Sequence, residues 1–474
     1  MKAGSGIFIL VLVLAFANGC ANHQTMSQVP LTIPLPQSFS STGDTTAPVK
    51  WWHSFKSEQL NEIVNHSFRD NLDLKVAWSR LTQAEAVTRS SRAYRLPSVD
   101  GSLGLARRKS VFLQGAAFGA RNINSFYLST YDLSLAASYE VDLWNRLRSQ
   151  SSAASRDKRA ARAELETIAL SLSASLVETW FQIIEQQTQL ELLNDQLKIG
   201  QTFLELLELR LGQGLSSALD VYQQRQQLSS TRALIPQVKS QEQVLIHQLA
   251  TLLTKIPHKM ELDIPNQLPA LPPLPKTGFP IAMLDNRPDI RSAMHRVFAA
   301  DYRVAAAVAA RRPSLQLNAS NGFSSSSASG LFDNFIWSLG TNILAPIFDA
   351  GRRKAEVHRT KAVVEEQLNR YASTVLTAIR EVEDALAREK FQQDYIAELD
   401  ENISLSEATL EEAKARYLNG LSDYLSVLTA LVSLQNLQRT RVSAQRQLLS
   451  FRISLHRALG GQWTREMTRG EEEL

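Results

Sequence analysis

The chain has 474 residues and a formal net charge of +4, with 51 Lys and Arg against 47 Asp and Glu. So small an excess of positive charge gives no reason to expect a nucleic-acid partner. We accordingly interpret the basic run Arg107-Arg108-Lys109 as a solvated loop. A single cysteine excludes a disulfide within the chain.

The first 19 residues are predicted to be a signal peptide. Lys2 precedes an apolar stretch over 7–17, which is shorter than the roughly 20 residues of a membrane span and fits the apolar region of a secretory leader. Cys20 stands where a bacterial lipoprotein is cleaved and acylated, although Ala17 replaces the usual Leu. Cys20 is therefore the predicted lipidation site, and an ordinary leader with a chance cysteine is the alternative.

Residues 20–50 are rich in Ser, Thr and Pro and predict an extended, lipidated tether. Trp51 and Trp52 mark the start of the folded part, and helices are expected over 57–70 and 73–96. No later run of 18 apolar residues suggests a membrane-spanning helix.

The next elements are predicted strands, because polar and apolar residues alternate with period two. In the second strand, expected over 128–143, the predicted lipid-facing side chains are Tyr131, Leu133, Leu135, Tyr139, Val141 and Leu143. Shorter runs predict strands over 99–110, 314–325 and 335–345. Such strands fit either a soluble sandwich or a membrane barrel, and the leader and cysteine favour the barrel. Four strands are too few to close a barrel, whereas three copies would supply twelve.

Two very long helices are expected over 147–212 and 350–418, since 147–199 and 352–419 contain neither Gly nor Pro. Each would be about 95–100 Å long. Return helices are expected over 215–256 and 421–459. Gly214 and Gly420 fit left-handed C-caps, and Ser216 and Ser422 fit the N-caps of the return helices.

The two halves of the chain repeat each other. The segment 210–221 returns 206 residues later as 416–427, and an earlier block returns with an offset of 216. We therefore expect one structural repeat over 51–256, a Pro-rich linker or equatorial region over 257–286, a second repeat over 287–460, and a tail over 461–474.

These features resemble the outer membrane efflux protein family, the TolC-like channels, and within it the lipoprotein (NodT/OprM-like) branch. The resemblance rests on Trp51-Trp52, Asn71-Leu-Asp-Leu74, Tyr139-Glu-Val-Asp-Leu-Trp144, Arg287-Pro-Asp-Ile290 and Pro346-Ile-Phe-Asp-Ala-Gly-Arg352. It implies an α+β membrane protein that forms a homotrimer. In it, four strands per chain build a 12-stranded barrel in outer-membrane lipid of a Gram-negative bacterium, and a coiled-coil helical barrel extends into the periplasm.

The resemblance also implies a function. Such a duct passes small molecules or drugs from an inner-membrane efflux pump and a periplasmic adaptor (membrane fusion protein) to the exterior. A duct for type I protein secretion is the alternative, and the pore motifs do not separate the two. A periplasmic coiled-coil scaffold is a third possibility, against which the alternating strands argue. The sequence contains no catalytic, nucleotide-binding or metal-binding motif, so we expect no enzyme, no cofactor and no metal.

Two sites follow from the resemblance. The turns between long and return helices are the expected docking tips for the adaptor, at Arg210, Gly214, Leu215, Ser216, Arg416, Gly420, Leu421 and Ser422. The expected periplasmic gate comprises Leu425, Ser426, Thr429, Asp220 and Tyr417. Leu425 matches an apolar constriction, while neutral Ser426 and Thr429 stand where relatives carry acids.

Within the gate, Asp220 and Tyr417 match a carboxylate and a tyrosine of the family. In the relatives these two side chains hydrogen-bond each other across neighbouring helices. Ser422 stands where relatives carry an arginine partner. The alternative interpretation makes Leu425 part of a coiled-coil core and Asp220 a solvated helix start.

Overall fold

A computed structural model describes residues 23–46, 48–114, 122–257 and 262–468. The predicted signal peptide and Cys20 lie outside them. The elements in chain order are η1 (Trp51–Phe55), α2 (Glu58–Asp70), α3 (Leu72–Ala93), β1 (Ser98–Gln114), β2 (Asn122–Val141), α4 (Arg146–Gly212), α5 (Ala218–Leu252), η3 (Pro280–Ala282), α6 (Met283–Asn286), α7 (Pro288–Ala309), β3 (Ser314–Ser325), β4 (Phe335–Leu344), α8 (Arg352–Leu418), α9 (Tyr424–Leu459) and η4 (Gln462–Glu466).

The chain forms two compact units, and these units cut across the two predicted repeats. One contains residues 81–160 and 293–371 with the N-terminal segment up to Pro30, and the other contains 31–80, 161–292 and 372–474. Each unit therefore takes residues from both repeats, because α4 and α8 each continue from one unit into the other.

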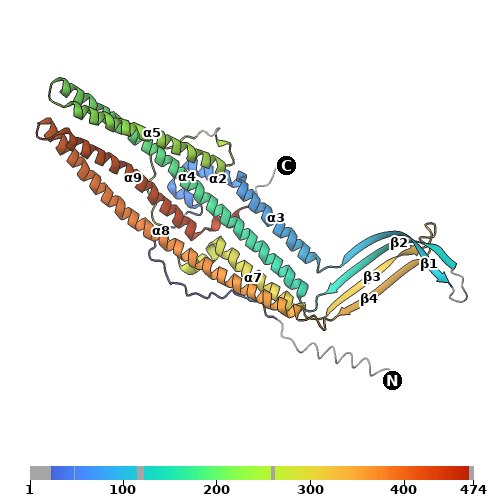
Figure 1. Cartoon of the computed structure of the whole chain (residues 1–474). Coiled ribbons are helices and arrows are strands. Elements are labelled where there is room, and N and C mark those ends of the chain that lie inside the picture. Colours follow the sequence, from blue (N-terminus) through green and yellow to red (C-terminus); the bar gives the residue numbers. More distant parts are fainter. Residues whose placement is uncertain (1–22, 47, 115–121, 258–261, 469–474) are drawn as a thin grey trace. The chain divides into compact units, whose positions relative to one another are not determined.

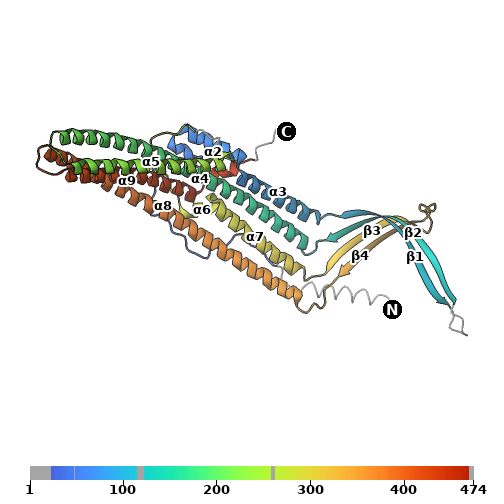
Figure 2. The ribbon, with the colours of Figure 1, turned by 45° about the horizontal axis from the view of Figure 1, so that its top comes forward.

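The four strands form one antiparallel sheet in the order β1-β2-β3-β4 (Figure 1). β1 and β2 pair from Ser98–Ser138 to Gln114–Asn122, while the pairing of β2 with β3 ends at Tyr131–Ser325. The β1–β2 hairpin therefore extends beyond the four-stranded part of the sheet (Figure 2). Within the chain, the outer edges of β1 and β4 have no neighbouring strand among the described residues.

Two details of the strand prediction were wrong. Arg107, Arg108 and Lys109 lie inside β1 and not in a loop, since β1 continues to Gln114. Leu143 lies in the turn after β2, which ends at Val141, and the Leu143 amide donates to the Val141 carbonyl at 2.8 Å.

The long helices α4 and α8 have 67 residues each, which gives each a length of about 100 Å, as predicted. One 18-residue window of α4 is long and apolar enough to cross a membrane, but 67% of it is buried within the structure. The apolar character of α4 is therefore that of a core helix.

The core of the unit that contains η1 explains the paired tryptophans of the sequence. Trp52 is fully buried and meets Trp463 edge-on, with ring centroids 5.0 Å apart. Trp51 stacks on His456 at 5.3 Å, and burial lowers the pKa of His456 to about 3, so this imidazole is neutral. Aromatic residues from the two ends of the chain thus pack in one core.

The linker between the repeats is fastened to this unit by the N-terminal segment and by a buried arginine. The Gly43 amide donates to the Pro275 carbonyl at 3.1 Å. Arg452 is 1% exposed, donates to both carboxylate oxygens of Glu389 at 2.8 and 2.6 Å, and also donates to the Pro273 carbonyl at 2.8 Å. One guanidinium therefore connects α9, α8 and the linker.

We expect Arg452→Met to lower the free energy of unfolding by about 3–5 kcal/mol, because it leaves the Glu389 carboxylate buried without its partner. Thermal unfolding in detergent, followed by circular dichroism, measures the loss. Arg441→Met is the matched control: Arg441 pairs with Asp400 between the same two helices, but both side chains are about 40% exposed, and such pairs contribute about 0–1 kcal/mol. Equal losses in the two variants would contradict the assignment.

Candidate functional site

The turns that end the two long helices have the same backbone structure. Gly214 and Gly420 both have φ +73°, as the predicted C-caps require. The Leu215 amide donates to the Arg210 carbonyl at 2.8 Å, and the Leu421 amide donates to the Arg416 carbonyl at 2.8 Å. Both turns are therefore Schellman motifs, which satisfy carbonyls at the helix end.

The predicted N-caps of the return helices were each wrong by one residue. Ser217, and not Ser216, caps α5: its hydroxyl accepts from the Asp220 amide at 3.2 Å while the Asp220 carboxylate accepts from the Ser217 amide at 3.0 Å. Asp423, and not Ser422, caps α9 by accepting from the Ser426 amide at 3.3 Å. The spacing Ser217-x-x-Asp220 is a capping-box signal that could have identified the first cap.

Apolar side chains are exposed at both turns. Leu215 and Leu421 are 59% and 69% exposed, and Leu219 at the start of α5 is 63% exposed. Exposed apolar side chains gathered on a tight turn are typical of a contact surface for another protein. The Arg210 side chain also lies at this end of the helices, since its guanidinium is 4.9 Å from the centre of the Tyr417 ring.

The expected bond between Tyr417 and Asp220 is indirect in this chain. The Tyr417 hydroxyl donates to the Ser216 hydroxyl at 3.2 Å, and the Ser216 hydroxyl donates to the Asp220 carboxylate at 2.9 Å. The serine is thus a relay between α8 and the start of α5. Ser216 was predicted as a tip residue and helix cap, and this role of its hydroxyl was not predicted from the sequence.

A second polar contact lies deeper in the same helical hairpins. The Tyr424 hydroxyl donates to the Gln224 side chain at 2.7 Å, and the Gln224 amide donates to the Gly200 carbonyl at 2.7 Å. Burial raises the pKa of Tyr424 well above its ordinary value, so the phenol stays protonated. A Cβ on Gly200 would lie 2.8 Å from the end of the Leu228 side chain, so a larger residue at this position would require Leu228 to shift.

The predicted gate residues Leu425, Ser426 and Thr429 lie on the exposed side of α9. Leu425 is 51% exposed, so in the single chain it is not a coiled-coil core residue. Asp423, which was not predicted as a gate residue, lies beside them, and its carboxylate accepts from the Ser426 hydroxyl at 3.0 Å. The neutral character expected of this region therefore holds for Ser426 and Thr429 but not for the residue that caps the helix.

One face of the sheet is apolar and exposed. The register places Leu103 beside Leu133 and places Leu133 beside Phe323. The exposed apolar residues on this face are Val99, Leu103, Leu105, Leu133, Leu135, Leu317, Phe335, Trp337, Leu339 and Ile343, together with Val111 on the part of β1 that extends beyond β3 and β4. Predicted lipid-facing residues Tyr131, Tyr139 and Val141 share this face and are partly exposed. A soluble sandwich would cover such a face with a second layer.

The opposite face of the sheet is mostly polar, with Ile336 and Leu344 of β4 as exposed apolar exceptions. Ser102 bonds Ser134 at 2.9 Å across β1 and β2, and the Ser324 hydroxyl donates to the Asp132 carboxylate at 2.6 Å across β3 and β2. A sheet with one apolar and one mostly polar face, neither of them covered by another described part of the chain, matches the wall of a membrane barrel around an aqueous interior.

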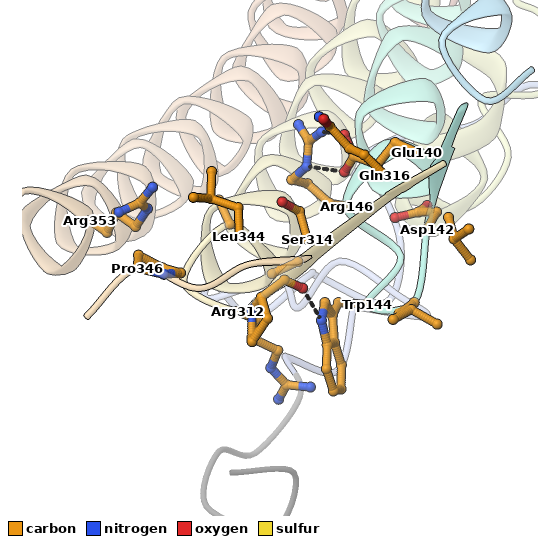
Figure 3. A pocket seen from close by; sticks show the side chains of 15 residues that line it. Glu140, Asp142, Trp144, Arg146, Arg312, Ser314, Gln316, Leu344, Pro346 and Arg353 are labelled. Atoms are coloured by element: carbon orange, nitrogen blue, oxygen red, sulfur yellow. Dashed lines mark hydrogen bonds and ion pairs between the residues drawn. The ribbon is translucent and has the colours of Figure 1, made fainter. Parts of the chain in front are cut away.

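The junctions between strands and long helices enclose a polar cavity of about 290 Å³ (Figure 3). Arg146 forms an ion pair with Glu140 at 2.6 Å, and the Trp144 indole donates to the Pro313 carbonyl at 2.7 Å. The Arg312 guanidinium lies 4.5 Å from the centre of the Trp144 ring. These contacts tie β2 and α4 to the start of β3, so we interpret the cavity as part of a structural joint.

Both junctions use an aspartate to begin the long helix. The Asp142 carboxylate accepts from the Arg148 amide at 2.7 Å, and the Asp349 carboxylate accepts from the Arg353 amide at 3.2 Å. An anionic side chain at a helix start compensates the unpaired amides and the helix dipole. Among the described residues, no group of three or more His, Cys, Asp or Glu is arranged to hold a metal ion.

Comparisons with known proteins agree with this architecture. The model of the outer membrane efflux protein family matches residues 64–254 and 280–461. The solvent efflux pump outer membrane protein SrpC of Pseudomonas putida is 30% identical over 471 residues, which cover 96% of this chain and 98% of that protein. The pyoverdine export outer membrane protein OpmQ of Pseudomonas putida is 30% identical over 414 residues, covering 87% and 88%.

Solved structures agree as well. The outer-membrane channel OprN is 27% identical, with a TM-score of 0.82 over 94% of this chain and 99% of that one. VceC of Vibrio cholerae is 26% identical, with a TM-score of 0.77 over 88% and 99%. The chain therefore belongs to the outer membrane efflux protein family and is an outer-membrane exit duct of an efflux system.

Proposed function

We propose that three copies of the chain close a 12-stranded barrel in the outer membrane. The proposal rests on the edges of the sheet: β1 and β4 each have one edge without a neighbouring described strand, and the sheet is apolar on one face. An open edge in lipid leaves backbone groups without hydrogen bonds, at several kcal/mol each. Pairing β4 of one copy with β1 of the next removes both edges.

We expect native mass spectrometry of the detergent-extracted protein to give the mass of three chains. The matched variant replaces Ile343 in β4 by Pro, which removes a backbone donor and disrupts strand pairing, and it should shift the protein to single chains. A wild-type mass of one or two chains would contradict the trimer.

Within the trimer, the two turns of each chain are the proposed docking tips for a periplasmic adaptor. The exposed Leu215 and Leu421 at rigid Schellman turns support this role. Leu425, Ser426 and Thr429 form the proposed gate, where three copies of Leu425 would meet near the axis and exclude water. The relay from Tyr417 through Ser216 to Asp220 holds the two turns of one chain together in the closed state.

The proposed cargo is small organic molecules supplied by an inner-membrane pump. SrpC and OpmQ are named for solvent efflux and pyoverdine export, and both support this class over secreted protein. Cells that lack this chain should therefore accumulate more of a fluorescent small molecule than cells that carry it. Unchanged accumulation together with loss of a secreted protein would favour the alternative.

Cys20 is the proposed lipid anchor, and we expect mass spectrometry of the mature protein to find an acylated Cys20 at its N-terminus. Two or more acyl chains hold a protein firmly to a membrane, but a closed barrel is also held by its apolar face. Cys20→Ser should therefore reduce delivery to the outer membrane while leaving pore formation in planar bilayers unchanged. An unmodified Cys20, or an uncleaved leader, would refute the anchor.

A further inference from the structure

Two cationic side chains of the β1–β2 hairpin lie on the same face as the apolar residues, just beyond the four-stranded part of the sheet. The four-stranded part ends at Tyr131, which pairs with Leu105 on β1 and Ser325 on β3. Arg107 and Lys109 follow Leu105 at the next two positions of the same face. Two and four residues along a strand correspond to about 7 and 14 Å.

An aromatic ring holds the two cations together. The Arg107 guanidinium lies 4.9 Å from the centre of the Tyr127 ring, and the Lys109 ammonium lies 5.8 Å from it. Tyr127 is the direct partner of Lys109 in the register and is 60% exposed. Cation–π contact restrains both side chains, so two positive charges are held side by side on one ring.

Among the residues that the structure describes, neither Arg107 nor Lys109 forms an ion pair. The carboxylate nearest in the ladder, Asp132, pairs with Gly104 and therefore lies on the opposite, polar face. A charged pair without a counter-charge on an apolar face is an attractive site for an anion. The guanidinium suits the oxygens of a phosphate, and the ammonium adds a second charge.

The position along the strand selects the source of the anion. A barrel strand tilted by about 45° rises about 5 Å over two residues and about 10 Å over four. If the apolar face contacts hydrocarbon up to Leu105 and Tyr131, Arg107 lies within the headgroup layer, which adds roughly 5–8 Å on each side of the core, and Lys109 lies at its outer edge. We propose that Arg107, Lys109 and Tyr127 form a binding site for the phosphate groups of an anionic glycolipid in the outer leaflet. This inference rests on the proposed lipid-facing role of the strand face.

The test measures binding of bisphosphorylated lipid A and of dephosphorylated lipid A to the purified full-length trimer by native mass spectrometry. We expect the wild type to prefer the phosphorylated lipid and Arg107→Gln with Lys109→Gln to bind it about tenfold less tightly. Arg108→Gln is the matched control, because Arg108 lies between the two cations but on the other face; it should bind like the wild type. Inorganic phosphate in large excess should not displace the lipid.

Three results would overturn the proposal: equal binding of the two lipids, equal losses in the Arg108 control, or displacement by inorganic phosphate. A nitroxide on Leu133→Cys, in the same preparation reconstituted into liposomes, separates this failure from failure of the barrel. Access of oxygen to that label with no preference for phosphorylated lipid would leave the strand face in the membrane and refute the phosphate site alone.

Discussion

Gly420→Trp should abolish efflux while leaving the trimer and its membrane insertion intact. Gly420 has φ +73°, and a Cβ at this position meets no atom within 4 Å. The strain of a left-handed residue other than glycine is about 1–2 kcal/mol, which is small for a unit with an extensive core. The indole would instead project from the turn beside the exposed Leu421 and block the approach of adaptor helices.

Two comparisons separate bulk at the tip from loss of the turn. Gly420→Asn keeps a small residue that tolerates the left-handed conformation, so efflux should survive. Gly214→Trp tests the other turn, which has the same Schellman geometry, and should also impair efflux. Efflux is measured as the drug susceptibility of cells that carry each variant. The amount of trimer in the outer membrane is measured in parallel. Full resistance in Gly420→Trp would refute docking at this turn.

Breaking the relay at the turns should open the closed end. Ser216→Ala removes the link between Tyr417 and Asp220 but leaves the Ser217 cap in place. A hydrogen bond to a carboxylate contributes about 1.5–3 kcal/mol, so the loss of one such bond should raise the ratio of open to closed states by roughly 10- to 100-fold for each chain. Asp220→Ala combined with Tyr417→Phe should have a similar effect.

Single-channel recording in planar bilayers measures this change as higher mean conductance. Tyr222→Phe is the control, because it removes a hydroxyl, as Ser216→Ala and Tyr417→Phe do, but from an α5 side chain that is 66% exposed. Its conductance should match the wild type. If Ser216→Ala also conducts like the wild type, the relay does not hold the gate.

Local patterns predicted the elements that depend on nearby residues. The Schellman turns follow from Gly214 and Gly420, since the left-handed position must be filled by a residue without a Cβ penalty. The alternation in β2 predicted the apolar face, because side-chain direction in a strand has period two. Arg107, Arg108 and Lys109 were interpreted as a loop because they interrupt the apolar positions, although the backbone pairing continues past them to Gln114.

Contacts between distant residues could not be predicted in the same way. The relay joins Tyr417 to Ser216 across 201 positions of the chain, and nothing local to either residue selects that partner. The bond from Arg452 to Glu389 likewise depends on how α8 and α9 pack. The division into two units was missed because contacts between the repeats, which the sequence pattern does not reveal, define each unit.

If the four strands form the wall of a water-filled duct in a lipid membrane, successive side chains of β2 face lipid and water in turn. Single cysteines at each position from Thr130 to Val141, in a Cys20→Ser background, can each carry a nitroxide in liposomes. Access to oxygen, which concentrates in lipid, should peak at odd positions such as Leu133 and Leu135. Access to a water-soluble paramagnetic complex should peak at even positions such as Asp132 and Ser134. We expect two opposed signals with period two; water access at all positions, or no alternation, would show that the sheet is not the wall of such a duct.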